Sequence, residues 1–208
     1  MKYYFVTISV AFLVIGVRSH QHHNHVSRRS RMPKDCVRQS FDDSVVSQSR
    51  LVLLAEKVNQ RLAYMKDVAG YKAQNHLQIE DVVQESKVIN SSLTEAKDLG
   101  LDPESVISFI VAQINAAKAI QYRYRADWLS YTEEDWQPQP LDMVREKIGQ
   151  LSSEILRELA AQANDRPVEA HERNAFVLRL EQDNLKCADK MRLFDAILVV
   201  RSSVSIKR

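Results

Sequence analysis

Glycine and proline are scarce in this chain, whose 208 residues include only four glycines and five prolines. Folds rich in β-strands use these residues in their many turns, and collagen-like or linker-like chains need far more of them. Aromatic residues account for only 7% of the chain, whereas the helix-favouring Ala, Leu, Glu, Gln, Lys and Arg are plentiful. The composition and length therefore predict an all-α protein with one globular domain, or at most two small ones.

The chain also has little net charge, +2 in all, but that charge is unevenly distributed. Residues 1–38 hold seven Lys or Arg against one acidic residue, a net charge of +6. The remaining residues hold 22 basic and 26 acidic side chains, a net charge of −4. General nucleic-acid binding needs a basic surface, so we expect no nucleic-acid partner for the main domain.

Only one apolar run stands out, and it is short. The 13 residues from Phe5 to Val17 follow the basic residue Lys2, and Val17 and Ser19 are small enough for the −3 and −1 positions of a signal-peptidase site. Thirteen residues are too few to span a bilayer comfortably. The pattern predicts a secretory signal peptide at residues 1–19, with an uncleaved anchor as the alternative.

The signal peptide sets the expected organisation of the rest. Residues 20–42 are polar, basic and His-rich without periodicity, which predicts a disordered lead-in. Residues 43–208 are expected to form the all-helical domain. The mature protein is predicted to be secreted or periplasmic, with no membrane contact after cleavage.

The chain contains only two cysteines, Cys36 and Cys187. An even pair in an exported protein suggests a disulfide, here between the lead-in and the last predicted helix. Two free, buried thiols are the alternative. The spacing fits no metal site, and we predict none.

Apolar residues recur at intervals of three and four along most of the body, which predicts amphipathic helices. In the first predicted helix, Gly70 is a possible weak point, and a break is expected after that helix, at residues 77–79. Asp102 and Pro103 are typical of the start of a later helix. A polar loop is expected at 130–140. The predicted helices are Ser44–Asn75, Glu80 or Asp81 to Asp98, Asp102 to Trp128, Leu141–Ala163 and Pro167–Val200.

Three polar residues lie where these helical stripes should be apolar. Arg61 and Lys72 share the stripe of the first helix and are 11 residues apart, roughly 16 Å along a continuous helix. Gln121 follows Ala117 by four residues and also points inward. The two cations could bracket a small anion. Alternatively, they extend to the rim or pair with acidic residues, because an unpaired buried charge is costly.

Several short motifs give the chain a resemblance to a known family. They are RLAYMK at 61–66, YK at 71–72, IED at 79–81, GLDPE at 100–104 and QINAAKAIQYRYRADW at 113–128. They resemble the all-helical (AroQ-type) chorismate mutases, and most of all the exported, gamma-type subclass. The similarity runs from about residue 45 to residue 160, and its most specific part is the series of Arg, Lys, Glu-Asp and Gln.

The resemblance implies roles for the polar residues. Arg61 would bind a substrate carboxylate, and Lys72 would donate a hydrogen bond to the ether oxygen of the substrate. Gln121 would donate the second hydrogen bond to that oxygen. Arg145 would match the arginine that, in the gamma-type subclass, comes from a later helix of the same chain. A guanidinium suits the binding of a carboxylate because it can donate two parallel hydrogen bonds.

Acidic residues would complete the site, and two positions depart from the family pattern. Asp81 and Glu85 would match acidic positions near the substrate hydroxyl. Gln84 stands where many family members have an arginine, and Ala117 stands where a small hydroxyl residue is common. Gln84 can form hydrogen bonds but carries no charge, and Lys87, one turn on, is a candidate for the missing cation.

The reaction implied by the resemblance is the Claisen rearrangement of chorismate to prephenate. It needs no nucleophile, metal or cofactor, because the protein holds the flexible dianion in its reactive conformation and stabilises the charge that grows on the ether oxygen. It needs no histidine either, so His76 and His171 are expected on the surface. We expect a homodimer with each active site in one chain. The alternative, motivated by Gln84 and Ala117, is a catalytically inactive secreted interaction or effector protein.

Overall fold

The structure is a computed structural model, and it describes residues 50–131 and 133–203. Over these residues the chain is all-α, as predicted, and the closest approach to a sheet is an isolated bridge between Leu101 and Ser202. The helices are α2 (Arg50–Ala63), α3 (Met65–Gln74), α4 (Val82–Asp98), α5 (Pro103–Asp127), α6 (Leu141–Asp165), the 3₁₀ helix η1 (Ala170–Glu172), α7 (Arg173–Leu178) and α8 (Cys187–Ile197).

Some predictions fall outside the described residues. They are the signal peptide at 1–19, the lead-in at 20–42, and the position of Cys36. Cleavage near Ser19 and the disulfide from Cys36 to Cys187 therefore stay predictions. None of the helices in the described part of the chain combines the length and apolar character needed to cross a membrane.

Two aspartates start the central helices, as the sequence predicts. Asp81 precedes α4, and its side chain accepts a hydrogen bond from the backbone N–H of Gln84 at 3.1 Å. Asp102 precedes α5 and accepts from the backbone N–H of Glu104 at 3.2 Å. Each carboxylate satisfies an N–H that the first turn of a helix leaves without a partner. Gly100, with φ of 79°, allows the sharp connection between the two helices.

The first predicted helix is interrupted at a different place from the one expected. The prediction of Gly70 as the weak point is wrong, because the helix is interrupted at Tyr64 and Gly70 lies inside α3. The interruption is slight: Tyr64 keeps helical dihedrals, and the N–H of Val68 donates to its carbonyl at 3.1 Å. Arg61 and Lys72 consequently lie in the last turns of two successive helices, and both are buried.

The prediction of one helix from Pro167 to Val200 is also wrong. The segment forms η1 and α7, then an irregular stretch, then α8. A residue far away in the sequence explains the break, since the Asn59 side chain on α2 accepts from the backbone N–H of Glu181 and from Gln182 Nε2, both at 2.9 Å. Asn184 follows with φ of 62°, a conformation that ends helical geometry.

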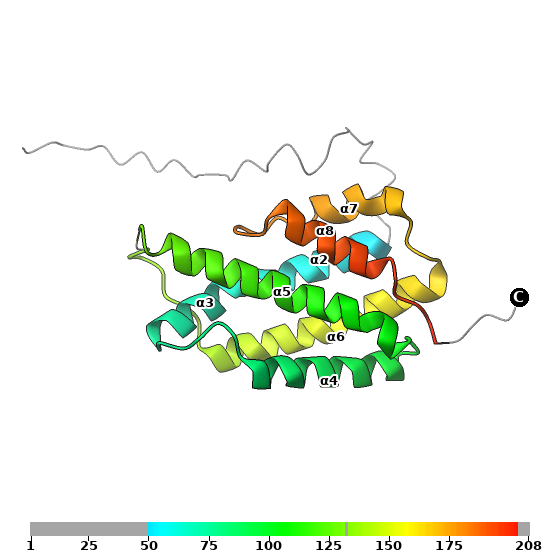
Figure 1. Ribbon diagram of the computed structural model, residues 1–208, viewed down its shortest axis with the longest axis horizontal. Coiled ribbons are helices and arrows are strands. Elements are labelled where there is room, and N and C mark those ends of the chain that lie inside the picture. Colours follow the sequence, from blue (N-terminus) through cyan, green and yellow to red (C-terminus); the bar gives the residue numbers. More distant parts are fainter. Residues whose placement is uncertain (1–49, 132, 204–208) are drawn as a thin grey trace, which may run out of the picture. The chain divides into compact units, whose positions relative to one another are not determined.

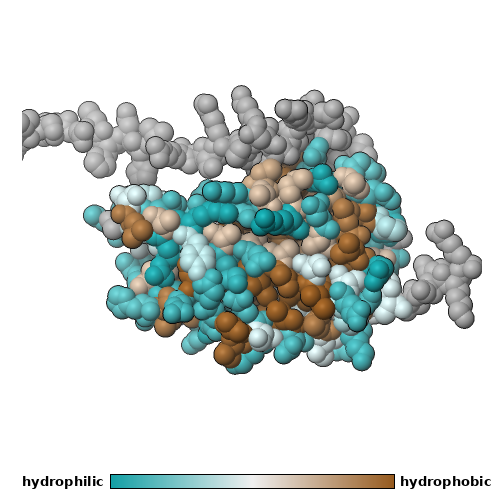
Figure 2. Space-filling view, in the orientation of Figure 1, coloured by the Kyte–Doolittle hydropathy of each residue, from teal (hydrophilic) through white to brown (hydrophobic). Residues whose placement is uncertain are grey.

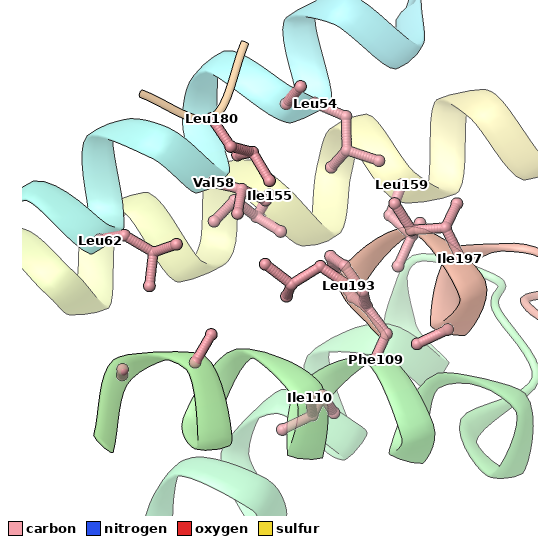
Figure 3. Packing of buried hydrophobic residues seen from close by; sticks show 14 of the residues in the cluster. Leu54, Val58, Leu62, Phe109, Ile110, Ile155, Leu159, Leu180, Leu193 and Ile197 are labelled. Carbon is pink, nitrogen blue, oxygen red and sulfur yellow. The ribbon is translucent and has the colours of Figure 1, made fainter. Parts of the chain in front are cut away.

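The core lies where α2, α5, α6 and α8 meet. In contact are α2 with α6, α5 with α8, α3 and α4 with α5, and α7 with α2. In Figure 1, α5 lies between α8 and α4. Figure 3 shows apolar side chains from these helices pointing toward one another. Fully buried side chains at their centre include Leu54, Val58, Phe109, Ile155, Leu159, Leu193 and Phe194.

Polar and apolar residues are mixed on the surface. Figure 2 shows hydrophilic side chains over much of the face that it views, with apolar patches between them. Exposed large apolar side chains of the described part include Val82 and Val83 at the start of α4, and Ile107 and Val111 on α5. Surface apolar residues are common in folded proteins, so they do not by themselves mark an interface.

The loop between α5 and α6 (residues 128–140, described except at 132) carries an aromatic stack. The ring centroids of Tyr124 and Trp128 are 5.5 Å apart, and those of Trp128 and Trp136 are 5.7 Å apart. The ammonium of Lys66, on α3, lies 4.5 Å from the Trp136 ring centroid and forms an ion pair with Glu133. Cation–π and ionic contacts thus attach this loop to α3.

Gly70 allows the loop to approach α3 closely. A Cβ atom at Gly70 would lie 2.5 Å from Cη2 of Trp136 and 3.2 Å from Cβ of Pro138, the first of which is closer than atoms pack. One turn earlier, Asp67 accepts hydrogen bonds from the backbone N–H of Gln139 at 3.0 Å and from its side chain at 3.1 Å. The loop therefore braces the helix that carries Lys72.

Candidate functional site

A cavity of about 550 Å³ lies among α2, α3, α4, α5 and α6. Its size is within the range of small-molecule sites. Its lining combines apolar side chains, such as Val68, Ile114 and Ile148, with charged and amide groups. All seven residues predicted for the site line it, although they come from five segments of the chain: Arg61, Lys72, Asp81, Gln84, Glu85, Gln121 and Arg145.

Arg61 is a buried cation in the last turn of α2, with only 5% of its surface exposed. Its Nε donates a hydrogen bond to Ser152 Oγ at 3.0 Å, and its Nη1 is buried without a hydrogen-bond partner in the protein. Burial lowers the pKa of its guanidinium to about 10, so the group stays protonated at neutral pH. A buried cation with a free donor is suited to an anionic ligand.

Lys72 is the second buried cation, in the last turn of α3. Its ammonium donates to the backbone carbonyl of Ile79 at 2.6 Å. The chain returns toward Lys72 after His76, which has φ of 53°. Burial lowers the pKa of Lys72, and the negative charge of Asp81 opposes this shift. One hydrogen bond leaves two of the three ammonium N–H groups available for a ligand.

The first turn of α4 contributes two carboxylates and one amide to the cavity. Asp81 accepts a hydrogen bond from the Arg145 guanidinium at 3.2 Å, in addition to its capping bond. Glu85 forms an ion pair with Lys118 of α5 at 3.0 Å, and it accepts from the backbone N–H of Asp81 at 3.4 Å. Gln84 lines the cavity one residue before Glu85.

Gln121 is buried on α5, with 5% of its surface exposed. Its Nε2 donates to the carbonyl oxygen of Ala117 at 3.2 Å and contacts Met65 Sδ at 3.6 Å, while its Oε1 has no hydrogen-bond partner. The amide nitrogen has two N–H groups, so one remains beyond the bond to Ala117, and in this structure it meets only the weak acceptor Met65 Sδ. The neutral amide faces the same cavity as Lys72.

Several cavity residues were not predicted from the sequence. Ser152 follows Arg145 by seven residues, or two turns of α6, and this spacing could have indicated that both residues face the cavity. Lys118 could not be recognised from the sequence, because a lysine beside apolar helix positions usually extends into solvent. Lys87, considered as a substitute cation for Gln84, does line the cavity and is exposed.

The charges on the cavity wall favour an anion. Three carboxylates lie among the lining residues, and two of them, Asp81 and Glu85, are paired with Arg145 and Lys118. The lining has a formal charge of +2, which matches a ligand with two negative charges. Its five cations are Arg61, Lys72, Lys87, Lys118 and Arg145.

Neither histidine considered in the sequence belongs to the cavity. His76 follows α3 and His171 lies in η1, and both are exposed. In the described part of the chain no group of three or more His, Cys, Asp or Glu side chains is arranged to hold a metal ion. The polar groups that converge on the cavity are therefore cations, amides, hydroxyls and carboxylates.

The comparisons with known proteins agree on one family. Residues 53–122 match the family "Chorismate mutase type II". The chain is 53% identical over 148 residues to a secreted chorismate mutase of Yersinia pestis, covering 71% of this chain and 80% of that protein. It is 37% identical over 152 residues to a monofunctional chorismate mutase of Enterobacter agglomerans, covering 73% of this chain and 84% of the relative.

Solved structures give the same picture. The crystal structure of the secreted chorismate mutase from Yersinia pestis matches with a TM-score of 0.68 and 51% identity, over 72% of this chain and 97% of that one. A chorismate mutase from Burkholderia thailandensis matches with a TM-score of 0.64, over 71% of this chain and 98% of that one. At 21% identity the second match concerns the fold alone.

Proposed function

The chain belongs to the type II chorismate mutase family, and from this premise we propose that it is an exported enzyme that rearranges chorismate to prephenate in the cavity described above. The observation that carries the proposal is the burial of two cations, Arg61 and Lys72, in one cavity that Gln121 and Arg145 also line. A cavity with a lining charge of +2 suits a substrate with two carboxylates.

The reaction is an internal rearrangement, so its balance is simple. The C–O bond of the ether breaks while a C–C bond forms within the same molecule, and no atom enters or leaves. The protein's task is to hold the flexible substrate in the folded conformation in which the reacting carbons meet. It also has to stabilise the negative charge that grows on the ether oxygen.

Two arginines are proposed to fix the conformation of the substrate. Arg61 and Arg145 lie on α2 and α6, so carboxylates bound to them would be held from two different helices. Ser152 supports this role by occupying the Nε of Arg61, which leaves other N–H groups for a carboxylate. Asp81 likewise accepts a hydrogen bond from one nitrogen of the Arg145 guanidinium, which leaves its other N–H groups for a carboxylate.

Lys72 and Gln121 are proposed to act on the ether oxygen. Both are buried and line the cavity from α3 and α5. A buried donor interacts strongly with a developing charge, because little water screens it. The ammonium supplies a positive charge, and the amide supplies a donor that does not titrate.

The remaining positions define the hydroxyl side of the substrate. Asp81 and Glu85 are proposed to lie near its hydroxyl group, at the start of α4. Gln84 is proposed to contribute a hydrogen bond, and Lys87 the positive charge that an arginine at position 84 would bring. Lys87 lines the cavity and is exposed, which leaves its long side chain room to reorient.

The decisive experiment incubates the purified mature protein with chorismate and follows the loss of its ultraviolet absorbance. We expect turnover in the wild type, none in Arg61→Ala, and unchanged helical circular dichroism in both. Arg173→Ala is a matched control, because Arg173 pairs with Asp195 outside the cavity. A folded Arg61→Ala protein with near-normal turnover would remove Arg61 from the site.

A second candidate function is a catalytically inactive, secreted interaction protein. Gln84 and Ala117 favour it, since they stand where charged and hydroxyl residues are common in the family. The same assay separates the two functions: a folded, wild-type protein without turnover supports the second. Gln84→Arg with Ala117→Ser then tests whether these two residues are the cause.

Export and dimer formation complete the proposal. The signal-like residues 1–19 and the similarity to a secreted relative support export. N-terminal sequencing of the protein recovered outside the cytoplasm checks the cleavage near Ser19. The homodimer is proposed from the resemblance to the gamma-type enzymes. Sedimentation analysis at micromolar concentration, where we expect twice the chain mass, checks it.

A further inference from the structure

Two buried polar atoms next to the main cavity lack partners, and their chemistry is complementary. Arg61 Nη1 is a hydrogen-bond donor and Gln113 Oε1 is an acceptor, and neither has a hydrogen-bond partner in the protein. Arg61 and Gln113 are 5% and 7% exposed. Leaving a buried polar atom unsatisfied is costly, so such a pair calls for an explanation.

Both residues line a second, much smaller cavity. Its volume is about 10 Å³, and Ser92 and Ser152 contribute hydroxyl groups to its wall, together with apolar residues of α4, α5 and α6. Ser92, Ser152 and Arg61 also line the main cavity, so the small cavity adjoins it. This volume is close to the smallest that holds one water molecule, provided that two to four polar partners surround it.

We propose that one buried water molecule bridges Arg61 Nη1 and Gln113 Oε1, and that Gln113 is thereby a positioning residue for Arg61. The water accepts a hydrogen bond from Nη1 and donates one to Oε1. Its second hydrogen points to a serine hydroxyl of the small cavity. This inference rests on the proposed function, because it describes how the substrate-binding arginine is held.

The bridge completes the support of the guanidinium. Ser152 accepts from Nε at 3.0 Å and itself donates to the carbonyl of Ile148 at 2.7 Å, which fixes one edge of Arg61. The water fixes a second point on the guanidinium. With two points held, the planar group of this cavity-lining residue has one orientation, and the N–H groups that neither contact uses remain for a carboxylate. A pre-oriented guanidinium loses less freedom when it binds a carboxylate.

The structure also distinguishes Gln113 from an ordinary buried glutamine. Gln162, on α6, is 3% exposed and uses its Nε2 to bond the carbonyl of Arg166 at 3.1 Å, away from both cavities. Replacing either residue by methionine keeps the side-chain length and removes hydrogen bonding. Only the Gln113 variant should disturb Arg61, so Gln162→Met is the matched control.

The first test compares steady-state kinetics on chorismate. For Gln113→Met we expect KM to rise roughly tenfold, the equivalent of one lost hydrogen bond to a charged group, with kcat changed less than about threefold. Gln162→Met should leave both constants near wild type. A folded Gln113→Met protein with wild-type KM overturns the proposal. If that variant does not fold, Gln113→Asn, which withdraws the acceptor by one carbon, takes its place with the same expectation.

A second test asks whether Gln113 acts through Arg61. In an Arg61→Lys background, the additional rise in KM caused by Gln113→Met should shrink to less than about twofold, since the group that it positions is gone. An undiminished tenfold rise in both backgrounds contradicts the proposal.

A crystal structure at high resolution tests the water without using activity. It should show one water molecule within hydrogen-bond distance of Arg61 Nη1 and Gln113 Oε1, and Gln113→Met should lose it. A dry cavity in the wild-type protein overturns the inference even if the enzyme is active. A wild-type protein without turnover refutes the proposed function, and the water test still decides whether Gln113 holds Arg61.

Discussion

The guanidinium of Arg145 donates a hydrogen bond to the carboxylate of Asp81 at 3.2 Å, which links α6 to the first residue before α4. Both side chains are more than a third exposed, at 40% and 37%. An exposed ion pair of this kind contributes at most about 1 kcal/mol to stability. Its significance is that it holds Arg145 at the cavity while leaving it accessible to a substrate.

Removing Arg145 should therefore affect binding more than folding. For Arg145→Ala we expect KM for chorismate to rise by at least about tenfold, with a free energy of unfolding within about 1 kcal/mol of wild type. Kinetics and urea denaturation measure the two quantities. Arg166→Ala is the control, because Arg166 pairs with Glu172 and neither residue lines the cavity. Equal effects of the two substitutions on KM would contradict the assignment.

Arg61 should be costly to the fold. Burial lowers its pKa to about 10, which corresponds to a penalty on the order of 3 kcal/mol for the charged form. The folded protein carries this cost at every pH below about 10 and loses it as the pH rises toward the ordinary pKa of an arginine side chain. Arg61→Met should thus raise the free energy of unfolding by about 1–3 kcal/mol at pH 7 while abolishing turnover. A loss of stability in urea denaturation would contradict this.

Gln121 offers a test based on pH. The wild-type amide donates at any pH, whereas Gln121→Glu would donate only when its carboxyl group, with an ordinary pKa of about 4.3, is protonated. Burial raises that pKa and the Lys72 charge lowers it, so the midpoint of the pH–rate profile is not set by these two effects. The direction is set, because the rate of the variant must fall as the pH rises. We expect a rate that is severely reduced near neutral pH, by about 10²–10³, and partly recovered in acid. An unchanged profile at pH 7 to 8 would show that Gln121 does not act on the ether oxygen.

Gly70 tests the contact between the α5–α6 loop and α3. A methyl group at this position would lie 2.5 Å from the Trp136 ring, so Gly70→Ala should displace the loop and lower both stability and kcat. Gly149→Ala is the comparison for stability, because nothing lies within 4 Å of its Cβ position and alanine favours helix by about 1 kcal/mol. Thermal denaturation should move in opposite directions for the two variants. A Gly70→Ala protein as stable as the wild type would mean that the α5–α6 loop can move away from α3 without loss of stability.

The disulfide can be checked by mass. The oxidised mature protein should weigh two hydrogens less than the reduced protein, through a bond between Cys36 and Cys187. The bond would close a loop of about 150 residues and contribute about 4–5 kcal/mol in the chain-entropy model. Labelling of two thiols per chain in the denatured, unreduced protein would rule the bond out.

Local chemistry made much of the helical fold predictable. Asp81 and Asp102 start their helices because a carboxylate just before a helix accepts a hydrogen bond from an N–H group of the first turn. Each of these two bonds joins residues only two or three positions apart. The break after α7 was not predictable in the same way. It depends on Asn59, more than a hundred residues earlier in the chain, whose side chain takes up the N–H of Glu181.

Some residues of the candidate site could be predicted from the helical pattern, and others only from the family resemblance. Arg61, Lys72 and Gln121 could be found because each is polar on an apolar stripe, and all three are buried at the cavity. Arg145 and Glu85 lie on partly exposed faces, where charged residues are expected in any helix, so only the family resemblance pointed to them.

Gln113 was missed although it had the same signal as the three residues that were found. It lies eight residues before Gln121 on the buried stripe of α5, between Phe109 and Ala117. A single polar residue on such a stripe could be recognised from the sequence. The residue that it faces on another helix could not.

The aromatic stack has a spectroscopic consequence. The chain has only two tryptophans, Trp128 and Trp136, and both belong to that stack, on the loop that contacts α3 at Gly70. The intrinsic fluorescence of this protein is therefore a signal from one small region rather than an average over the fold. That loop contacts the helix carrying Lys72, so a change in emission on adding substrate would report a change at the contact of the loop with α3 and α5, without any attached dye.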